Sequence, residues 1–159
     1  MEKLAQKIGE RLKASGQRLV TAESCTGGWA SQVVTSVAGS SKWFERGFVT
    51  YSNDAKRELL GVKKSTLQSC GAVSEETARE MALGALERSQ GTLSLAITGV
   101  AGPDGGSASK PVGTVCFAWA RKGAPARSAT LRFQGDRESV RKQSVIHALE
   151  GVLELLDAG

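Results

Sequence analysis

Short apolar runs alternate with helical patterns along nearly the whole chain, and this alternation restricts the fold more than any other feature. Leu4, Ile8 and Leu12 recur at helical spacing and predict a helix over residues 3–15. Residues 18–22 then have the composition of a short strand. A chain that repeats this order buries one face of each helix against a sheet, so we expect an α/β fold with helices on both faces of the sheet.

The remaining elements continue this alternation. We expect a helix over 29–37, a helix over 54–61 that Ser52 or Asn53 can cap, and helices after the capping residues Ser74 and Asp136. Strands are expected over 44–51, 92–98, 112–120 and 126–133. The last two strands are joined by a short turn, which predicts that they are antiparallel. The sequence therefore indicates a three-layer α/β/α arrangement around a mixed, mostly parallel sheet.

Length and composition favour one domain. The chain has 159 residues, of which 40% are hydrophobic, and chains of about 100 to 200 residues usually fold around one core. We therefore expect residues 1–159 to form a single domain. The N-terminal segment carries charges throughout, and no later stretch approaches about 18 apolar residues, so we expect no signal peptide or membrane span. The default location for such a chain is the cytoplasm.

Charge and cysteine content narrow the class of partner. The chain has 21 Lys plus Arg against 16 Asp plus Glu, a net charge of +5, and is 5% aromatic. Its charges are interspersed, whereas nucleic-acid surfaces concentrate basic residues beside stacking aromatics, so we expect a small anionic ligand and neither nucleic acid nor membrane. Cys25, Cys70 and Cys116 are widely spaced and His147 is the only histidine, which indicates neither a disulfide framework nor a zinc site.

The segment TAESCTGG, residues 21–28, places hydroxyl and thiol side chains between a predicted strand and a helix opened by two glycines. Backbone N–H groups at the start of a helix lack partners within it, so such a turn can bind an anion or stabilise an oxyanion. The segment is neither a Walker loop nor the GxSxG elbow of α/β-hydrolases. A plain strand-to-helix turn with Ser or Thr capping explains the same residues.

A serine nucleophile at Ser24 would need a base. His147 is predicted to lie opposite the apolar face of its helix, as a solvated surface residue and not a catalytic one. A lysine with a lowered pKa is the usual substitute, and Lys56 follows Tyr51 in the first turn of a predicted helix, near its positive end. In the alternative interpretation Tyr51 is a half-buried strand residue and Lys56 is solvated. Their spacing in the sequence does not show whether either side chain contacts Ser24.

Cys25 is the alternative nucleophile of this segment. A thiolate at a helix N-terminus can have a lowered pKa, which would make it reactive. Because no histidine is available to activate the thiol, we interpret Cys25 as a small packing residue.

The glycine-rich loop TGVAGPDGG, residues 98–106, leaves a predicted strand at the sheet edge where the 21–28 turn also ends. Ligands of open α/β sheets bind in crevices at such edges, and glycines let the backbone approach a phosphate or ribose closely. A long surface loop without a ligand is the other interpretation. Arg46, Arg137 and Arg141 are candidate phosphate partners, because guanidinium groups match phosphate oxygens, although surface charge also explains them.

Five blocks of the sequence, in order, resemble the signature blocks of the CinA C-terminal domain family: TAESCTGG, AGSSKWFERGFVTYSNDAK, GAVSEETA, ITGVAGPDGG and KPVGTV. The resemblance covers about residues 3–157. The short chain, without a preceding nucleotide-processing domain, looks like the stand-alone deamidase branch of that family. The resemblance implies hydrolysis of the carboxamide of nicotinamide mononucleotide to nicotinic acid mononucleotide and ammonia, in pyridine nucleotide salvage, with no metal or organic cofactor.

The resemblance also implies site residues. The catalytic serine, tyrosine and lysine of the family fall on Ser24, Tyr51 and Lys56. In the implied reaction Ser24 attacks the carboxamide, Lys56 with Tyr51 accepts its proton, and backbone N–H groups of residues 26–28 stabilise the oxyanion. Direct attack by water is the alternative. The residues expected to bind substrate, with the phosphate against residues 99–102 and the pyridinium near the tyrosine, are Glu23, Thr26, Gly27, Gly28, Ser40, Ser41, Thr98, Gly99, Ala101 and Gly102.

Other functions stay open at this point. One is a binding module in a competence or DNA-damage response, with which the family is associated by name. Another is an amidase acting on a different pyridine compound, or a member that has lost activity, because a fold alone does not fix function. The intact Ser24, Tyr51 and Lys56 argue against lost activity. The sequence leaves homo-oligomer formation open.

Overall fold

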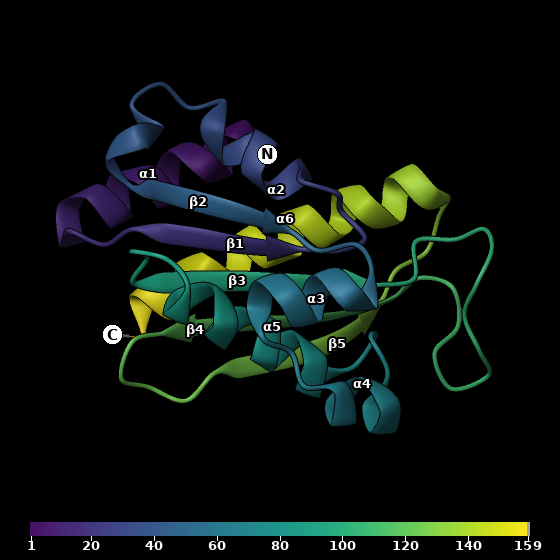
Figure 1. Ribbon diagram of the computed structural model, residues 1–159. Helices are drawn as coiled ribbons and strands as arrows, with labels where there is room; N and C mark the ends of the chain where they lie inside the picture. Colours follow the sequence, from purple (N-terminus) through teal and green to yellow (C-terminus); the bar gives the residue numbers. More distant parts are fainter. Residues whose placement is uncertain (159) are drawn as a thin grey trace.

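Five strands form one mixed sheet with helices on both faces in the computed structural model, which describes residues 1–158 (Figure 1). The elements, in chain order, are α1 (Glu2–Ser15), β1 (Leu19–Glu23), α2 (Trp29–Thr35), the short 3₁₀ helix η1 (Ser40–Lys42), β2 (Phe44–Val49), α3 (Asn53–Leu60), α4 (Lys64–Cys70), α5 (Glu75–Glu87), β3 (Leu93–Gly99), β4 (Thr114–Arg121), β5 (Arg127–Arg132) and α6 (Arg137–Asp157).

The strand order of the sheet is β2-β1-β3-β4-β5. β1 runs parallel to both β2 and β3, whereas β4 is antiparallel to both of its neighbours. Only β4 therefore runs against the other strands, which confirms the prediction of a mixed, mostly parallel sheet with an antiparallel pair near its C-terminal end. The carboxyl ends of β1, β2 and β3 lie at one edge of the sheet, and the arrowheads of β1 and β2 point there in Figure 1.

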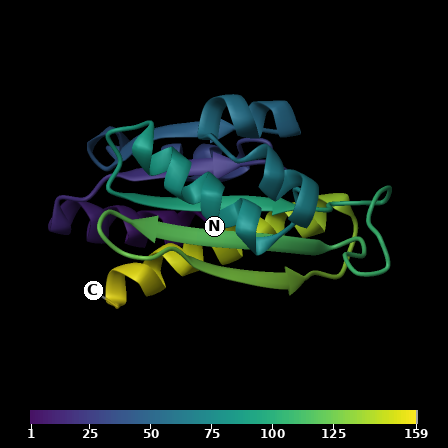
Figure 2. The same ribbon diagram turned by 60° about the horizontal axis from the view of Figure 1, so that its bottom comes forward.

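Two hydrophobic clusters, one on each face, hold the helices to the sheet. On one face α1, α2 and α6 pack around residues such as Ile8, Leu95 and Leu149. On the other face α3 and α5 pack around residues such as Val20 and Met81. Figure 2 shows α5 and α6 separated by the sheet. This arrangement confirms the predicted α/β/α layers.

Side chains cap three helices as the sequence predicts. Ser52, Ser74 and Asp136 each accept a hydrogen bond from a backbone N–H in the first turn of α3, α5 and α6, at 3.0, 3.1 and 2.9 Å. The cap at Ser52 fixes where α3 begins, and this beginning places Lys56 in the first part of the helix, directly after β2. None of the helices in residues 1–158 is long and apolar enough to cross a membrane.

The short helices α4 and η1 were not expected from the sequence. α4 has no buried residue, and η1 is only three residues long. Neither segment has the hydrophobic periodicity that reveals a longer packed helix, so the sequence gives no signal for them. β2 also ends earlier than expected, at Val49, which leaves Thr50 and Tyr51 in the connection to α3.

The prediction that His147 is a solvated surface residue is wrong. Its ring lies edge-on to three aromatic rings, with centroid distances of 4.6 Å to Phe117, 5.7 Å to Trp119 and 6.5 Å to Phe133. α6 contacts α1 and α2 as well as the sheet, so more than one side of it is covered and a single apolar face does not describe it. Burial lowers the pKa of His147, because desolvation disfavours the charged imidazolium.

Candidate active site

The turn that follows β1 lies where the ends of three parallel strands meet. The N–H of Ser24 donates to the carbonyl of Ile97 in β3 at 2.9 Å, and the N–H of Thr50, after β2, donates to the carbonyl of Glu23 at 2.8 Å. The turn then reaches α2 through two glycines in the left-handed region, including Gly28 with φ 103°, which other residues rarely adopt. The sheet and these glycines together fix the position of Ser24.

Lys56 is buried beside Ser24. Its side chain is 1% exposed, and its Nζ lies 2.9 Å from Ser24 Oγ, 2.9 Å from the carbonyl oxygen of Thr50 and 3.3 Å from that of Tyr51. Burial lowers the pKa of Lys56 from 10.5 to about 8, because desolvation disfavours the ammonium form. About one tenth of this amine is therefore neutral at pH 7, and about half at pH 8.

The surroundings of Lys56 satisfy both of its protonation states. A neutral amine has two N–H groups, which can donate to the carbonyls of Thr50 and Tyr51, and one lone pair, which can accept the Ser24 hydroxyl proton. As an ammonium it donates to all three oxygens, and Ser24 Oγ can then donate to the Tyr51 carbonyl, 3.5 Å away. A group that exchanges a proton with its neighbour while keeping its partners fits a general base.

Tyr51 reaches the site mainly through its backbone. Its carbonyl faces Lys56 and Ser24, whereas its phenolic oxygen accepts a hydrogen bond from Arg137 at 3.3 Å. The side chain is 63% exposed. The structure thus brings Ser24, Tyr51 and Lys56 together, but the Tyr51 hydroxyl contacts a different partner, and its part in proton transfer stays a prediction.

A cavity of about 230 Å³ opens onto Ser24 and Lys56. The residues that line it are Ser24, Cys25, Tyr51, Lys56, Ala72, Val73, Thr98, Gly99, Ala101 and Arg137. Three of the predicted substrate-binding residues, Thr98, Gly99 and Ala101, are among them. Ala72 and Val73 were missed, because small apolar side chains carry no chemical signal in the sequence, although they belong to the GAVSEETA block.

The Glu23 carboxylate points into the protein and not toward the cavity. Glu23 is fully buried and accepts four hydrogen bonds, from the Thr26 hydroxyl at 2.6 Å, the Ala30 N–H at 2.8 Å and the Ser31 N–H and hydroxyl at 3.1 and 3.2 Å. This geometry contradicts the prediction that Glu23 and Thr26 contact substrate, since both residues are fully buried and neither lines the cavity. They hold the turn to the start of α2.

The prediction that Ser40 and Ser41 assist in phosphate binding at this site is also wrong. Both lie in or beside η1, before β2 begins, whereas Tyr51 and Lys56 follow the end of β2. The strand has six residues, so the two groups are about 20 Å apart at a rise of about 3.3 Å per residue. One sequence block contains both groups, but the strand between them carries them to opposite edges of the sheet.

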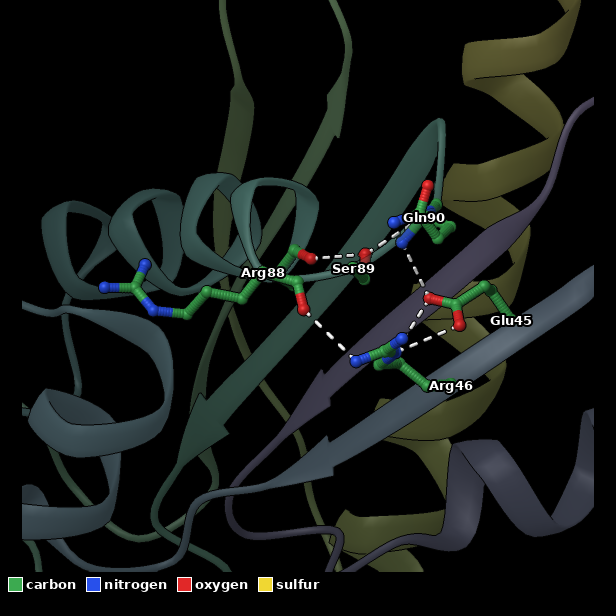
Figure 3. A network of polar contacts seen from close by, with 7 residues as sticks. Glu45, Arg46, Arg88, Ser89 and Gln90 are labelled. Atoms are coloured by element: carbon green, nitrogen blue, oxygen red, sulfur yellow. Dashed lines mark hydrogen bonds and ion pairs between the residues drawn. The ribbon is translucent and has the colours of Figure 1, made fainter.

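Arg46 takes part in a polar network (Figure 3) whose labelled residues do not line the cavity. Its Nε lies 2.8 Å from a Glu45 carboxylate oxygen, and its Nη1 donates to the Arg88 carbonyl at 3.3 Å. Glu45 also accepts the N–H of Gln90 at 2.9 Å. These contacts tie β2 to the connection between α5 and β3, so Arg46 is not available as a phosphate partner in the cavity.

The other two arginines both lie beside the Ser24 turn. Arg137 lines the cavity, and its Nη1 donates to the carbonyl of Gly102 at 2.8 Å. Gly102 itself does not line the cavity, but it contacts Arg137, which does. Arg141 donates to the carbonyls of Cys25 and Thr26 at 3.1 and 3.2 Å. Of the three candidate phosphate partners, Arg137 alone therefore faces the cavity.

Cys25 is a core residue, as the sequence indicates. It is buried within the hydrophobic cluster on the α6 face, and burial raises its pKa to about 12. The thiol is therefore protonated at neutral pH and a poor nucleophile. Among residues 1–158 no group of three His, Cys, Asp or Glu side chains is placed to hold a metal ion.

Comparison with known proteins gives consistent matches over nearly the whole chain. The model of the CinA C-terminal domain family matches residues 1–156. The nicotinamide-nucleotide amidohydrolase PncC of Escherichia coli K12 is 52% identical over 147 residues, which are 92% of this chain and 89% of that relative. A putative competence-damage inducible protein of Symbiobacterium thermophilum is 49% identical over 98% of this chain, but only 38% of that longer protein is covered. The crystal structure of the competence/damage inducible protein CihA from Agrobacterium tumefaciens superimposes with a TM-score of 0.94 at 46% identity, covering 98% of this chain and 94% of that one.

Proposed function

The chain belongs to the CinA C-terminal domain family, and on this basis we propose that it is an amidohydrolase that converts nicotinamide mononucleotide and water to nicotinic acid mononucleotide and ammonia. The observation that carries the proposal is the 2.9 Å contact between Lys56 Nζ and Ser24 Oγ at the floor of a cavity. The E. coli relative is named for activity on a nicotinamide nucleotide. A serine beside a neutral lysine is suited to attack on an amide.

In the proposed reaction Ser24 Oγ attacks the carboxamide carbon while its proton moves to the neutral Lys56 amine. The C–N bond then breaks, and the Lys56 ammonium returns the proton to the departing nitrogen, which leaves as ammonia. A water molecule attacks the resulting ester, Lys56 accepts its proton, and the carboxylate product is released as Ser24 is protonated again. The alternative in which water attacks directly, with Ser24 only orienting it, predicts no acyl adduct under rapid quench.

The oxyanion of the tetrahedral intermediate is assigned to an amide of the turn. The N–H of Gly27 donates to the Ser24 carbonyl at 3.0 Å, so it is already used. The N–H groups of Cys25 and Thr26 make no backbone hydrogen bond within the described part of the chain. Donors that are fixed before the reaction stabilise a developing negative charge without having to reorganise. Cys25 lines the cavity, whereas Thr26 is fully buried and does not line it. We therefore assign the oxyanion to the Cys25 amide.

The substrate is proposed to extend from Ser24 toward Arg137. With the carboxamide at Ser24, the pyridinium ring lies against Tyr51, and the phosphate reaches Arg137 and the glycine backbone of residues 99–102. The positive pyridinium also disfavours a protonated Lys56, so substrate binding helps to keep this base neutral. In this placement the positively charged ring of the substrate lies beside Tyr51, and its anionic phosphate lies beside the Arg137 guanidinium.

The proposal extends to the remaining properties of the chain. Ser24 and Lys56 supply a nucleophile and a base, so no metal or organic cofactor is required. We propose that residues 1–159 act as one domain in the cytoplasm on a small-molecule substrate, with no nucleic acid or membrane partner.

The test is ammonia release by the purified, chelator-treated protein from nicotinamide mononucleotide, nicotinamide riboside, nicotinamide and the dinucleotide. We expect the mononucleotide to have the highest kcat/KM. The riboside and nicotinamide have no phosphate, and the phosphate of the dinucleotide is joined to a second nucleotide and is not a free terminal group. Absence of turnover on all four compounds by a folded protein that binds DNA in a salt-dependent manner would overturn the proposal in favour of a binding module.

A further inference from the structure

Two arginines one turn apart on α6 have different surroundings. Arg137 and Arg141 are four positions apart, so they lie on the same side of the helix. Arg137 lines the cavity and contacts the Tyr51 hydroxyl. Arg141 does not line the cavity, and both of its hydrogen bonds go to backbone carbonyls of the Ser24 turn.

We infer that Arg141 is a positioning residue, which orients the peptide groups that follow Ser24 so that the Cys25 N–H can stabilise the oxyanion. This inference rests on the proposed amidohydrolase function. The carbonyl of Cys25 and the N–H of Thr26 belong to one planar trans peptide unit and point in opposite directions. Because the guanidinium holds that carbonyl at 3.1 Å, it also fixes the direction of the Thr26 N–H.

The next peptide unit is held in the same way. The Thr26 carbonyl accepts a hydrogen bond from Arg141 Nη2 at 3.2 Å, and the N–H of Gly27 in that unit donates to the Ser24 carbonyl at 3.0 Å. One guanidinium therefore sets two consecutive peptide planes. The second plane holds the Ser24 carbonyl through the Gly27 N–H, and the Cys25 N–H belongs to the same peptide unit as that carbonyl. The positive charge beside these carbonyls also polarises the peptide units and strengthens their N–H groups as donors.

Glu23 and Trp29 also restrict the positions of the turn and of the Arg141 guanidinium. The buried Glu23 carboxylate accepts the Thr26 hydroxyl and the first N–H groups of α2, so opposite charges hold the turn from inside and from the α6 side. The Arg141 guanidinium lies 5.5 Å from the centroid of the Trp29 ring, which restricts its position further. A lysine cannot reproduce this geometry, because its single ammonium lacks the planar fork that reaches two carbonyls at once.

The test compares Arg141→Gln and Arg141→Lys with Arg137→Gln, using nicotinamide mononucleotide and nicotinamide riboside as substrates. We expect Arg141→Gln to lower kcat about 10- to 100-fold on both substrates with KM nearly unchanged, as loss of an interaction made in the transition state does. Arg141→Lys should recover only part of that loss. Arg137→Gln should instead raise KM for the mononucleotide and leave KM for the riboside nearly unchanged. An Arg141→Gln variant that raises KM for the mononucleotide alone would overturn the inference and make Arg141 a phosphate ligand.

A second measurement does not depend on turnover. Hydrogen exchange of the Gly27 and Trp29 amides, which donate to the Ser24 and Thr26 carbonyls, should be faster in Arg141→Gln than in the wild type, while exchange in β3 and β4 stays the same. If the wild type releases no ammonia, the proposed function fails, and this exchange result still tests the positioning inference. Unchanged exchange in the turn of a folded Arg141→Gln protein would overturn it.

Discussion

Lys56 Nζ lies 2.9 Å from Ser24 Oγ although the two residues are 32 positions apart in the chain. β1 and β2 are parallel, and their register pairs Glu23 with Val49, so the residues that follow both strands meet at one edge of the sheet. The Ser52 cap starts α3 a few residues after β2 ends, and the first turn of α3 places the Lys56 side chain beside the residue that follows β1. The contact is therefore a consequence of strand register and helix capping.

The pH dependence of catalysis should report Lys56. Since the neutral amine is the active form and its pKa is lowered to about 8, about one tenth of it is neutral at pH 7. We expect kcat/KM to rise with pH through about 8 and to level off above it. His147→Ala provides the control and should keep the same rise. A profile that is flat between pH 7 and 9, or a rise that disappears in His147→Ala, would contradict the assignment.

The stability of the fold should depend on the same group. The pKa of Lys56 is about 8 in the folded protein and 10.5 in its ordinary state, so between these values the unfolded chain binds more protons and stability rises with pH. We expect urea unfolding to show that the free energy of unfolding of the wild type, relative to that of Lys56→Met, increases by on the order of 1–3 kcal/mol between pH 7.5 and pH 10. The other lysines are present in both proteins and cancel. An equal difference at both pH values would show that burial does not perturb this lysine.

The unpaired hydroxyl of Thr50 lowers the free energy of unfolding. Its Oγ1 is buried and has no hydrogen-bond partner, the one such side-chain atom in residues 1–158. Thr50→Val keeps the shape and removes the unpaired hydroxyl, so we expect it to stabilise the protein by about 1 kcal/mol. Thr77→Val is the matched control, because the buried Thr77 hydroxyl donates to the Gly71 carbonyl at 2.7 Å, and it should destabilise by about 1–2 kcal/mol. Destabilisation by both substitutions would indicate that Thr50 Oγ1 has a partner in solution.

Burial of His147 should make the protein sensitive to mild acid. The folded-state pKa of His147 is lowered by desolvation, so the unfolded chain binds more protons as the pH falls below the usual histidine value of about 6.5, and stability is lost there. His147→Phe keeps an aromatic ring beside Phe117 and cannot titrate. We expect the wild type to lose stability relative to His147→Phe between pH 7 and pH 5, measured by chemical unfolding. A constant difference over that range would place His147 in solvent, as the sequence first indicated.

Local patterns predicted most of the fold and indicated Ser24 and Lys56 as candidate residues, whose catalytic roles come from the resemblance to the family. Helical periodicity gave α1, and the SND sequence before Lys56 gave the start of α3, because capping and periodicity depend on neighbours in the chain. The orientation of Glu23 could not be predicted in this way. β1 is buried on both faces, so alternation along the strand does not show which way a side chain points.

The positions that were predicted wrongly depend on tertiary packing. Ser41 and Tyr51 share one sequence block, but only the strand between them decides that they lie at opposite sheet edges. The three candidate arginines are chemically alike, and their different partners follow from how α6 and β2 pack. His147 was misplaced because α6 is covered on more than one side.

The most direct test of the Ser24–Lys56 site is ammonia release from nicotinamide mononucleotide by the wild type, Ser24→Ala and Lys56→Met, each shown to be folded by circular dichroism. We predict turnover by the wild type and a loss on the order of a hundredfold or more in kcat for each variant, with binding of nicotinic acid mononucleotide retained. Wild-type turnover that survives in either folded variant would contradict the assignment of nucleophile and base.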